Sequence, residues 1–121
     1  MIQTVCGSMD KADLGITMAH EHLSVNLAGV RNDPDSIFTY SKLLLNELKR
    51  LRNAGANTVV EVSCIDMGRD VEALVRLSKE SGINIICATG FYLESYHPSW
   101  LKDAPIEKIE NIFKGELEKG V

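Results

Sequence analysis

Two of the chain's three histidines, His20 and His22, lie on either side of a glutamate in the stretch GITMAHEHLSVN. The apolar residues before them predict a buried strand over residues 16–22. Side chains alternate along a strand, so His20 and His22 point to one side, with Cα atoms about 6.7 Å apart, and Glu21 points to the other. Two imidazoles on one side can converge on a zinc, iron, nickel or copper ion. The spacing indicates half of a metal site, although two solvated histidines that bind nothing would show the same pattern.

The other candidate ligands are weaker, and a catalytic metal usually has three protein ligands and an open position. His97 stands in a loop before Pro98, where a surface role is the simpler interpretation. Asp66 follows a predicted strand and can reach the same rim, but its position just before a helix favours a capping role. Glu61 lies inside the apolar run VVEVS and needs a partner if it is buried. The sequence leaves open whether Glu61 faces the polar end of the fold or pairs with a cation.

The elements that must position these side chains alternate between strands and helices. β-Branched and apolar runs predict strands, and apolar residues spaced by three, four or seven predict amphipathic helices. This order is typical of βαβ units, in which helices cover a parallel sheet through right-handed crossovers. The expected strands are 2–5, 16–22, 57–63 and 83–89, and the expected helices are 35–53, 66–81 and 105–119, with a turn at 7–15 and a loop at 23–34.

The histidine pair lies at the carboxyl end of its predicted strand. In α/β folds, ligands and active sites gather at that end of the sheet. A sheet of three strands leaves both edges open, however, and apolar strand edges favour association. The thin sheet is a first indication that these 121 residues are part of a larger domain.

The composition is that of a globular protein, with 45% hydrophobic and 25% charged residues. A net charge of -4 and scattered lysines and arginines argue against a nucleic-acid partner. We expect no membrane association, because no run reaches the roughly 18 apolar residues of a membrane helix and no secretory signal is visible. The three cysteines form no CxxC pair, which argues against a zinc ribbon and favours reduced thiols in the cytoplasm, with Cys64 and Cys87 as buried hydrophobes.

Three motifs in order carry a family resemblance. The segments GITMAHEHL and VEVSCIDMGRDVEALVRLSKESGINIICATGFY resemble the phosphotriesterase family of the amidohydrolase superfamily, including its lactonase-like members. The opening MIQTVCG and the tail IEKIENIFKGELEKGV fit the same family, so the resemblance covers essentially the whole chain. It implies a TIM (β/α)8 barrel with two divalent metal ions, which we expect to be zinc, at the carboxyl ends of its strands.

The resemblance also implies roles for individual residues. His20 and His22 match the first-strand ligands of the more buried metal. Tyr92 matches an aromatic position that lines the substrate pocket in lactonase-like relatives. Arg69 and Asp70 belong to a structural family signature, and Cys64 stands where threonine is common in the motif.

Length is the main departure from the family. A barrel of this type needs about 250 residues, and this chain supplies only the first three βα units. We therefore expect residues 1–121 to be the amino-terminal portion of a single metal-dependent hydrolase barrel domain. The bridging ligand, a carboxylated lysine or a glutamate from the fourth strand, and the later histidines and catalytic aspartate are expected beyond Val121. No catalytic residue is expected within the chain, which alone would have little or no activity.

The expected activity of the whole barrel is hydrolysis of phosphotriester or lactone and ester bonds, with a hydroxide that bridges the two metals as nucleophile. The expected partner is a small-molecule ester or lactone, and the full-length family implies a possible homodimer. One alternative is a non-catalytic fragment or degenerate relative that associates through its open sheet edges. A single-metal deaminase also uses His-x-His on its first strand, but the CIDMGRD and ATGFY blocks argue against it. An unrelated small α/β binding module would make the three motifs coincidences.

Overall fold

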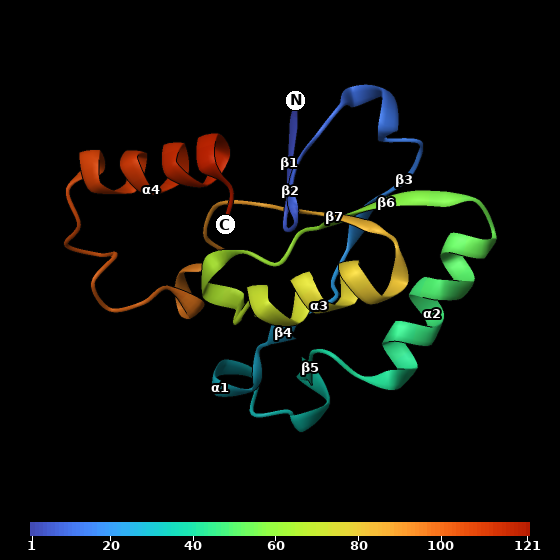
Figure 1. Ribbon diagram of the computed structural model, residues 1–121. Coiled ribbons are helices and arrows are strands. Elements are labelled where there is room, and N and C mark those ends of the chain that lie inside the picture. Colours follow the sequence, from blue (N-terminus) through green and yellow to red (C-terminus); the bar gives the residue numbers. More distant parts are fainter.

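Three strand–helix units follow one another along the chain (Figure 1). A computed structural model describes residues 1–121. The strands form one parallel sheet in the order β3-β6-β7, which confirms the α/β class and the first three βα units of a TIM barrel. The units comprise β3 (Ile16–Glu21), α2 (Lys42–Asn53), β6 (Ala56–Glu61), α3 (Val71–Ser81), β7 (Asn84–Cys87) and α4 (Ile106–Lys119).

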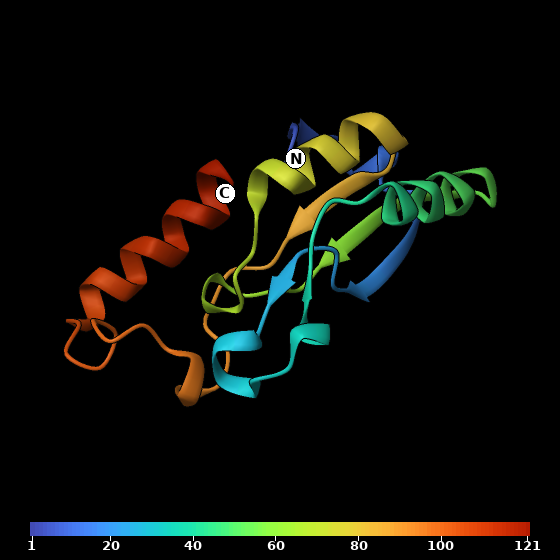
Figure 2. The same ribbon diagram turned by 90° about the horizontal axis from the view of Figure 1, so that it is seen from below.

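Helices α2 and α3 cover one face of the sheet (Figure 2). Val59 of β6 and Ile85 of β7 are fully buried against the apolar faces of these helices, which include Leu74 and Leu77. Each such side chain contributes about 1.5–3 kcal/mol through its removal from water. This core lies between the sheet and helices α2 and α3, and it supports the strands whose carboxyl ends carry the candidate site.

The first long helix begins later than the sequence indicates. Ser41 is the N-cap of α2, and its hydroxyl accepts a hydrogen bond from the Leu44 amide at 3.1 Å. The expected start at residue 35 is wrong, because the Asp33 carboxylate caps a separate turn, η2 (Pro34–Ser36), and β5 (Ile37–Phe38) follows it. The predicted end near residue 53 is confirmed.

Two segments expected to lack regular structure contain short elements. Residues 23–34 hold β4 (Val25–Asn26) and α1 (Ala28–Arg31), and β4 pairs antiparallel with β5. The turn at 7–15 holds β2 (Gly7–Met9), which pairs with β1 (Ile2–Thr4), and η1 (Lys11–Asp13). Two more short turns are η3 (Ile65–Met67) and η4 (Glu94–Tyr96). A second small core of Val25, Leu27 and Met67 explains why the segment after β3 is ordered.

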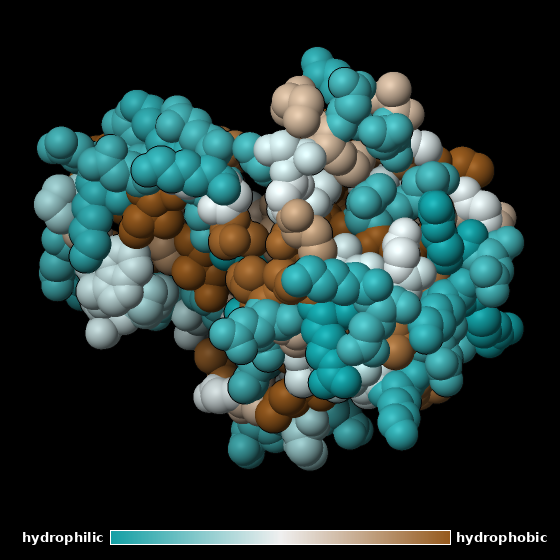
Figure 3. Space-filling model, viewed as in Figure 1, coloured by the Kyte–Doolittle hydropathy of each residue, from teal (hydrophilic) through white to brown (hydrophobic).

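The expectation of a buried first strand is wrong for this chain. β3 has a hydrogen-bonded neighbour on one side only, and its Ile16 and Met18 are 66% and 38% exposed. Ile106 at the start of α4 is 82% exposed. Apolar side chains also gather on the surface between α4 and the rest of the molecule (Figure 3). Apolar surface therefore remains uncovered at the strand edge and along α4.

Two further observations concern the helices and the cysteines. None of the helices has the length and apolar character needed to cross a membrane. All three cysteines are free. Cys64 and Cys87 are half-buried, so their expected burial is only partly confirmed. Burial raises the pKa of the Cys64 thiol and raises the pKa of the Cys87 thiol to about 12.

Candidate functional site

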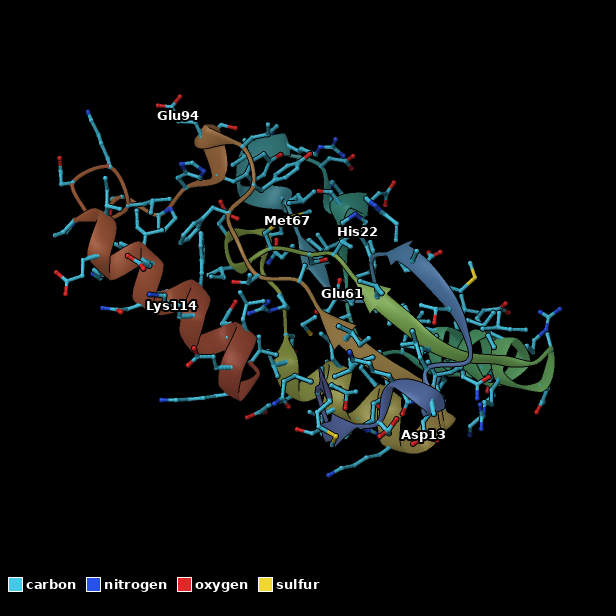
Figure 4. All side chains as sticks on the ribbon, turned by 90° about the horizontal axis from the view of Figure 1, so that it is seen from above. Asp13, His22, Glu61, Met67, Glu94 and Lys114 are labelled. Atoms are coloured by element: carbon cyan, nitrogen blue, oxygen red, sulfur yellow. The ribbon has the colours of Figure 1, made fainter.

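The two histidines at the end of β3 are neighbours in space. Their ring centroids lie 5.7 Å apart, with an angle of 77° between the ring planes. This is the juxtaposition that strand alternation predicts for His20 and His22. His20 is exposed and His22 half-buried, and His22 stands at the carboxyl end of the sheet (Figure 4). The role of the two rings as metal ligands stays a prediction.

Buried groups on β6 and just after it hold His22 in place. Ser63 Oγ lies 2.9 Å from His22 Nδ1. Glu61, next to His22 in Figure 4, accepts hydrogen bonds at Oε1 from the Leu23 amide at 3.3 Å and from the Ser63 amide at 3.2 Å. Both Glu61 and Ser63 are fully buried. The question that the sequence leaves open about Glu61 is thus answered: it fixes backbone on both sides of the site and forms no ion pair.

The donor set fits two ligands of a metal ion. Because Nδ1 of His22 is engaged by Ser63, Nε2 is the nitrogen left to bind a metal. No group of three or more histidine, cysteine, aspartate or glutamate side chains comes together to hold a metal. A catalytic metal usually takes three protein ligands, so two imidazoles alone would not complete such a site.

A cavity of about 320 Å³ opens beside His22. Its wall includes Tyr92, so the structure brings the two predicted kinds of residue, metal ligand and pocket aromatic, to one cavity. Phe38, Met67 and Arg31 also line it, and Arg31 forms no ion pair. The sequence did not point to these three, because Phe38 and Met67 fall within the expected helices 35–53 and 66–81, Arg31 falls within the loop expected at 23–34, and no pattern placed them beside His22.

Asp66 and His97 both bind the backbone of Tyr92. The Tyr92 amide donates to Asp66 Oδ1 at 2.7 Å, and His97 Nε2 donates to the Tyr92 carbonyl at 3.1 Å. The capping role expected of Asp66 is wrong, because α3 begins later and Asp70 is its N-cap, accepting from the Ala73 amide at 3.0 Å. The surface role expected of His97 is incomplete, since its side chain is only 31% exposed.

The residues of the GRD signature make structural contacts. Gly68 has φ +71°, and a Cβ built on it would lie 2.7 Å from Asn26 Cβ. Arg69 forms an ion pair of 2.7 Å with Glu116 of α4 and donates to the Ala88 carbonyl. Gly68 thus allows a close approach of two segments, and Arg69 ties α4 to the sheet.

The largest cavity lies apart from the histidine pair. It has a volume of about 930 Å³ and lies between the loop after β7 and α4. Phe91, Phe113 and Ile109 form apolar parts of its wall, and Tyr92 and His97 line it too. Because it contains neither His20 nor His22, the smaller cavity is the candidate site for chemistry.

The chain was compared with protein families, curated proteins and solved structures. A sequence model of the phosphotriesterase family matches residues 1–121. An aryldialkylphosphatase of Saccharolobus solfataricus is 28% identical over 117 residues, which cover 94% of this chain and 37% of that protein. An N-acetyltaurine hydrolase of Salmo salar is 30% identical over 151 residues, covering 98% of this chain and 43% of that protein.

A solved structure shows the same fold. The crystal structure of the phosphotriesterase homology protein from Escherichia coli, complexed with phosphate in its active site, is 27% identical with a TM-score of 0.84. The match covers 93% of this chain and 38% of that one. The chain thus spans less than half the length of the relatives that it matches.

Proposed function

This chain belongs to the phosphotriesterase family, and from that premise we propose that it forms the amino-terminal part of a metal-dependent hydrolase barrel that cleaves ester bonds of small molecules. Its relatives include proteins named as hydrolases. The observation that carries the proposal is the pair of imidazoles of His20 and His22, 5.7 Å apart, of which His22 lines a cavity that Tyr92 also lines.

The residues of this chain would hold one metal and shape the pocket. His20 and His22 would each bind the ion through an imidazole nitrogen. If His22 binds through Nε2, its proton stays on Nδ1, which donates a hydrogen bond to Ser63 Oγ. When bound, two divalent metals supply a hydroxide nucleophile near neutral pH and polarise the bond under attack. Tyr92 would orient the substrate from the side, and the charged side chains of Arg31, Asp33 and Asp35 line the same cavity.

The remaining ligands and the proton shuttle would come from residues outside this chain. We propose residues 1–121 as the amino-terminal portion of a single barrel domain, with no catalytic acid or base of its own. Zinc as the metal, an ester or lactone as substrate, the lack of nucleic-acid and membrane partners, a homodimer and a cytoplasmic location remain predictions from the sequence and its resemblance.

Cobalt(II) titration of the purified chain, followed by visible absorption, tests the metal half-site. We expect one weakly bound ion whose affinity falls about tenfold or more in His20→Ala and in His22→Ala, because each variant loses one of two ligands. Cys6→Ser is the control, since it removes an exposed thiol that could also bind cobalt and leaves the histidine pair and its cavity intact. Equal affinity in all four proteins would exclude the half-site.

Activity assays test whether the catalytic groups lie outside residues 1–121. We expect the metal-loaded chain to show no turnover of paraoxon, of a δ-lactone or of N-acetyltaurine, the last included because a relative is named for it. Turnover with two metals per chain would show that the catalytic groups lie within residues 1–121, against the proposal.

A second candidate function is a non-catalytic protein that associates through its sheet. The exposed Ile16 and Met18 on edge strand β3 favour it, because an unpaired apolar edge is a template for another chain. Size-exclusion chromatography with light scattering discriminates the two. A stable oligomer that Met18→Lys dissolves, in a chain that binds no cobalt, would favour the non-catalytic function.

A further inference from the structure

We propose that Asp66 and His97 are positioning residues. Together they hold the backbone N–H and C=O of Tyr92, an arrangement called the clamp below, and so fix the wall that Tyr92 forms between the two cavities. The proposal rests on the proposed function, because it assigns a role within the same pocket. It concerns residues that contact neither metal ligand and that act on the substrate only through Tyr92.

The clamp holds both polar backbone groups of one residue. The Tyr92 amide donates to Asp66 Oδ1 at 2.7 Å, and the Tyr92 carbonyl accepts from His97 Nε2 at 3.1 Å. Asp66 comes from η3 after β6, whereas His97 directly follows η4, so the two peptide groups on either side of the Tyr92 Cα are each held by a different side chain. A hydrogen bond to an ionised carboxylate is shorter and roughly twice as strong as a neutral one.

Asp66 has no other hydrogen-bond partner. Its side chain is 1% exposed, and Oδ2 has no hydrogen bond and lies 3.9 Å from His97 Nε2. A buried carboxylate is costly unless it is hydrogen-bonded or paired. Since Asp70 already caps α3, the Tyr92 amide and the nearby imidazole are the groups that offset the burial of Asp66.

Aromatic side chains hold the imidazole of His97 in place. The Phe91 ring lies 5.9 Å from the His97 ring, 5.8 Å from Trp100 and 5.8 Å from Phe113, measured between centroids. These distances are those of favourable aromatic pairs. His97 is therefore fixed on the α4 side, and the hydrogen bond to Tyr92 transmits that fixed position to the loop.

Tyr92 stands where a small movement changes the pocket. It lines both the cavity of about 320 Å³ beside His22 and the cavity of about 930 Å³ beside α4. Its ring packs against Tyr96 at 5.2 Å between centroids. With both backbone groups of Tyr92 held, its ring has a defined place between the cavities. Without the clamp, the loop is free to shift and the space available beside His22 changes, which alters the size of substrate that fits.

Nuclear magnetic resonance of the isotopically labelled chain tests the clamp directly. In Asp66→Asn we expect the Tyr92 amide proton to move upfield and its hydrogen exchange to rise about tenfold or more, because a charge-assisted hydrogen bond is lost. In His97→Ala we expect the Tyr92 carbonyl carbon to shift and the ring contact between Tyr92 and Tyr96 to weaken. His97→Gln keeps an N–H donor and should restore both signals.

Asp70→Asn is the matched control, because it neutralises a carboxylate of the same size four residues away that caps α3. It should alter the amides of α3 and leave the Tyr92 signals in place. If Asp66→Asn fails to fold, the His97 variants decide, since that side chain is partly exposed. Unchanged Tyr92 signals in the His97→Ala chain, or equal shifts in the Asp70→Asn control, would overturn the clamp. If neither His20→Ala nor His22→Ala weakens cobalt binding while the clamp signals are present, the proposed function is overturned and the clamp is not.

Discussion

The orientation of His22 is the residue-scale feature on which the candidate site depends. A ligating imidazole binds metal well when its second nitrogen has a fixed partner, because the partner sets the tautomer and the ring angle. Here that partner is Ser63 Oγ, 2.9 Å from Nδ1, and Ser63 is itself held by the buried Glu61. The Glu61 carboxylate holds the backbone amide of Ser63, and the Ser63 hydroxyl in turn contacts the imidazole of His22.

Replacing Ser63 with alanine tests the contact between Ser63 and His22. We expect Ser63→Ala to weaken cobalt binding about tenfold, within the range typical for such partners, with little change in melting temperature because alanine is nearly the same size. Ser95→Ala, on an exposed turn, is the control. An unchanged affinity would mean that Ser63 does not orient the ligand.

The half-buried thiol of Cys87 predicts a dependence of stability on pH. Burial raises the pKa of Cys87 from 9.0 to about 12, so the folded chain keeps the proton while the unfolded chain releases it. The stabilisation is present below pH 9 and is lost as the pH rises toward 12. Urea denaturation should show a steeper loss of stability above pH 9 than in Cys87→Ala. Parallel curves for the two proteins would contradict this.

At the scale of elements, short polar caps decide where the helices begin. Ser41 and Asp70 start α2 and α3. The sequence predicted the helix ends well, because Gly82 in the left-handed conformation leaves a clear signal at the end of α3. It predicted the start of α4 at Pro105 to within one residue, but it predicted the starts of α2 and α3 poorly, because Asp33, Asp35, Asp66 and Asp70 are all reasonable caps and only tertiary contacts choose between them.

Gly68, which follows η3, lies against Asn26 of β4, and this close approach predicts that a larger residue at position 68 destabilises the chain. With φ +71° and Asn26 Cβ 2.7 Å from the position of a new Cβ, Gly68→Ala meets both backbone strain and a clash. We expect a loss of about 1 kcal/mol or more in unfolding free energy. Gly29→Ala, in α1 with open space around it, should be neutral or slightly stabilising. Similar melting temperatures for the two variants would count against the tight approach.

The candidate site was predictable where one strand carries it and unpredictable where loops fold together. The histidine pair follows from alternation along a single strand. Asp66 and His97 contact Tyr92 although they lie 26 and 5 positions from it in the sequence, and no local sequence pattern predicts these contacts. The burial of β3 was overestimated because its apolar residues are visible in the sequence, but the neighbours that would cover them are not.

At the scale of the molecule, one buried ion pair joins the last helix to the sheet. The side chains of Arg69 and Glu116 are 6% and 18% exposed, and their pairing connects η3, β7 and α4 (Figure 1). Removing one partner of a buried pair leaves an uncompensated charge. No residue of α4 is fully buried, so this ion pair and the contact between the Phe113 and Phe91 rings attach the helix to the rest of the molecule.

Arg69→Ala should therefore release α4. We expect a loss of about 3–5 kcal/mol, with faster hydrogen exchange concentrated in residues 106–119. Arg50→Ala removes an exposed pair with Glu47 and should cost about 0–1 kcal/mol. If both variants lose the same stability, the anchoring role of Arg69 is wrong.

The most direct test of the histidine half-site is anomalous X-ray scattering at the zinc edge from crystals of the chain grown with zinc. We expect one anomalous peak bonded to both imidazoles, at about 2.0–2.1 Å from Nε2 of His22 and from a ring nitrogen of His20, with Ser63 still against Nδ1 of His22. Zinc bound elsewhere, or two histidine rings turned away from each other in the presence of saturating zinc, would remove the physical basis for placing a hydrolase metal at this end of the sheet.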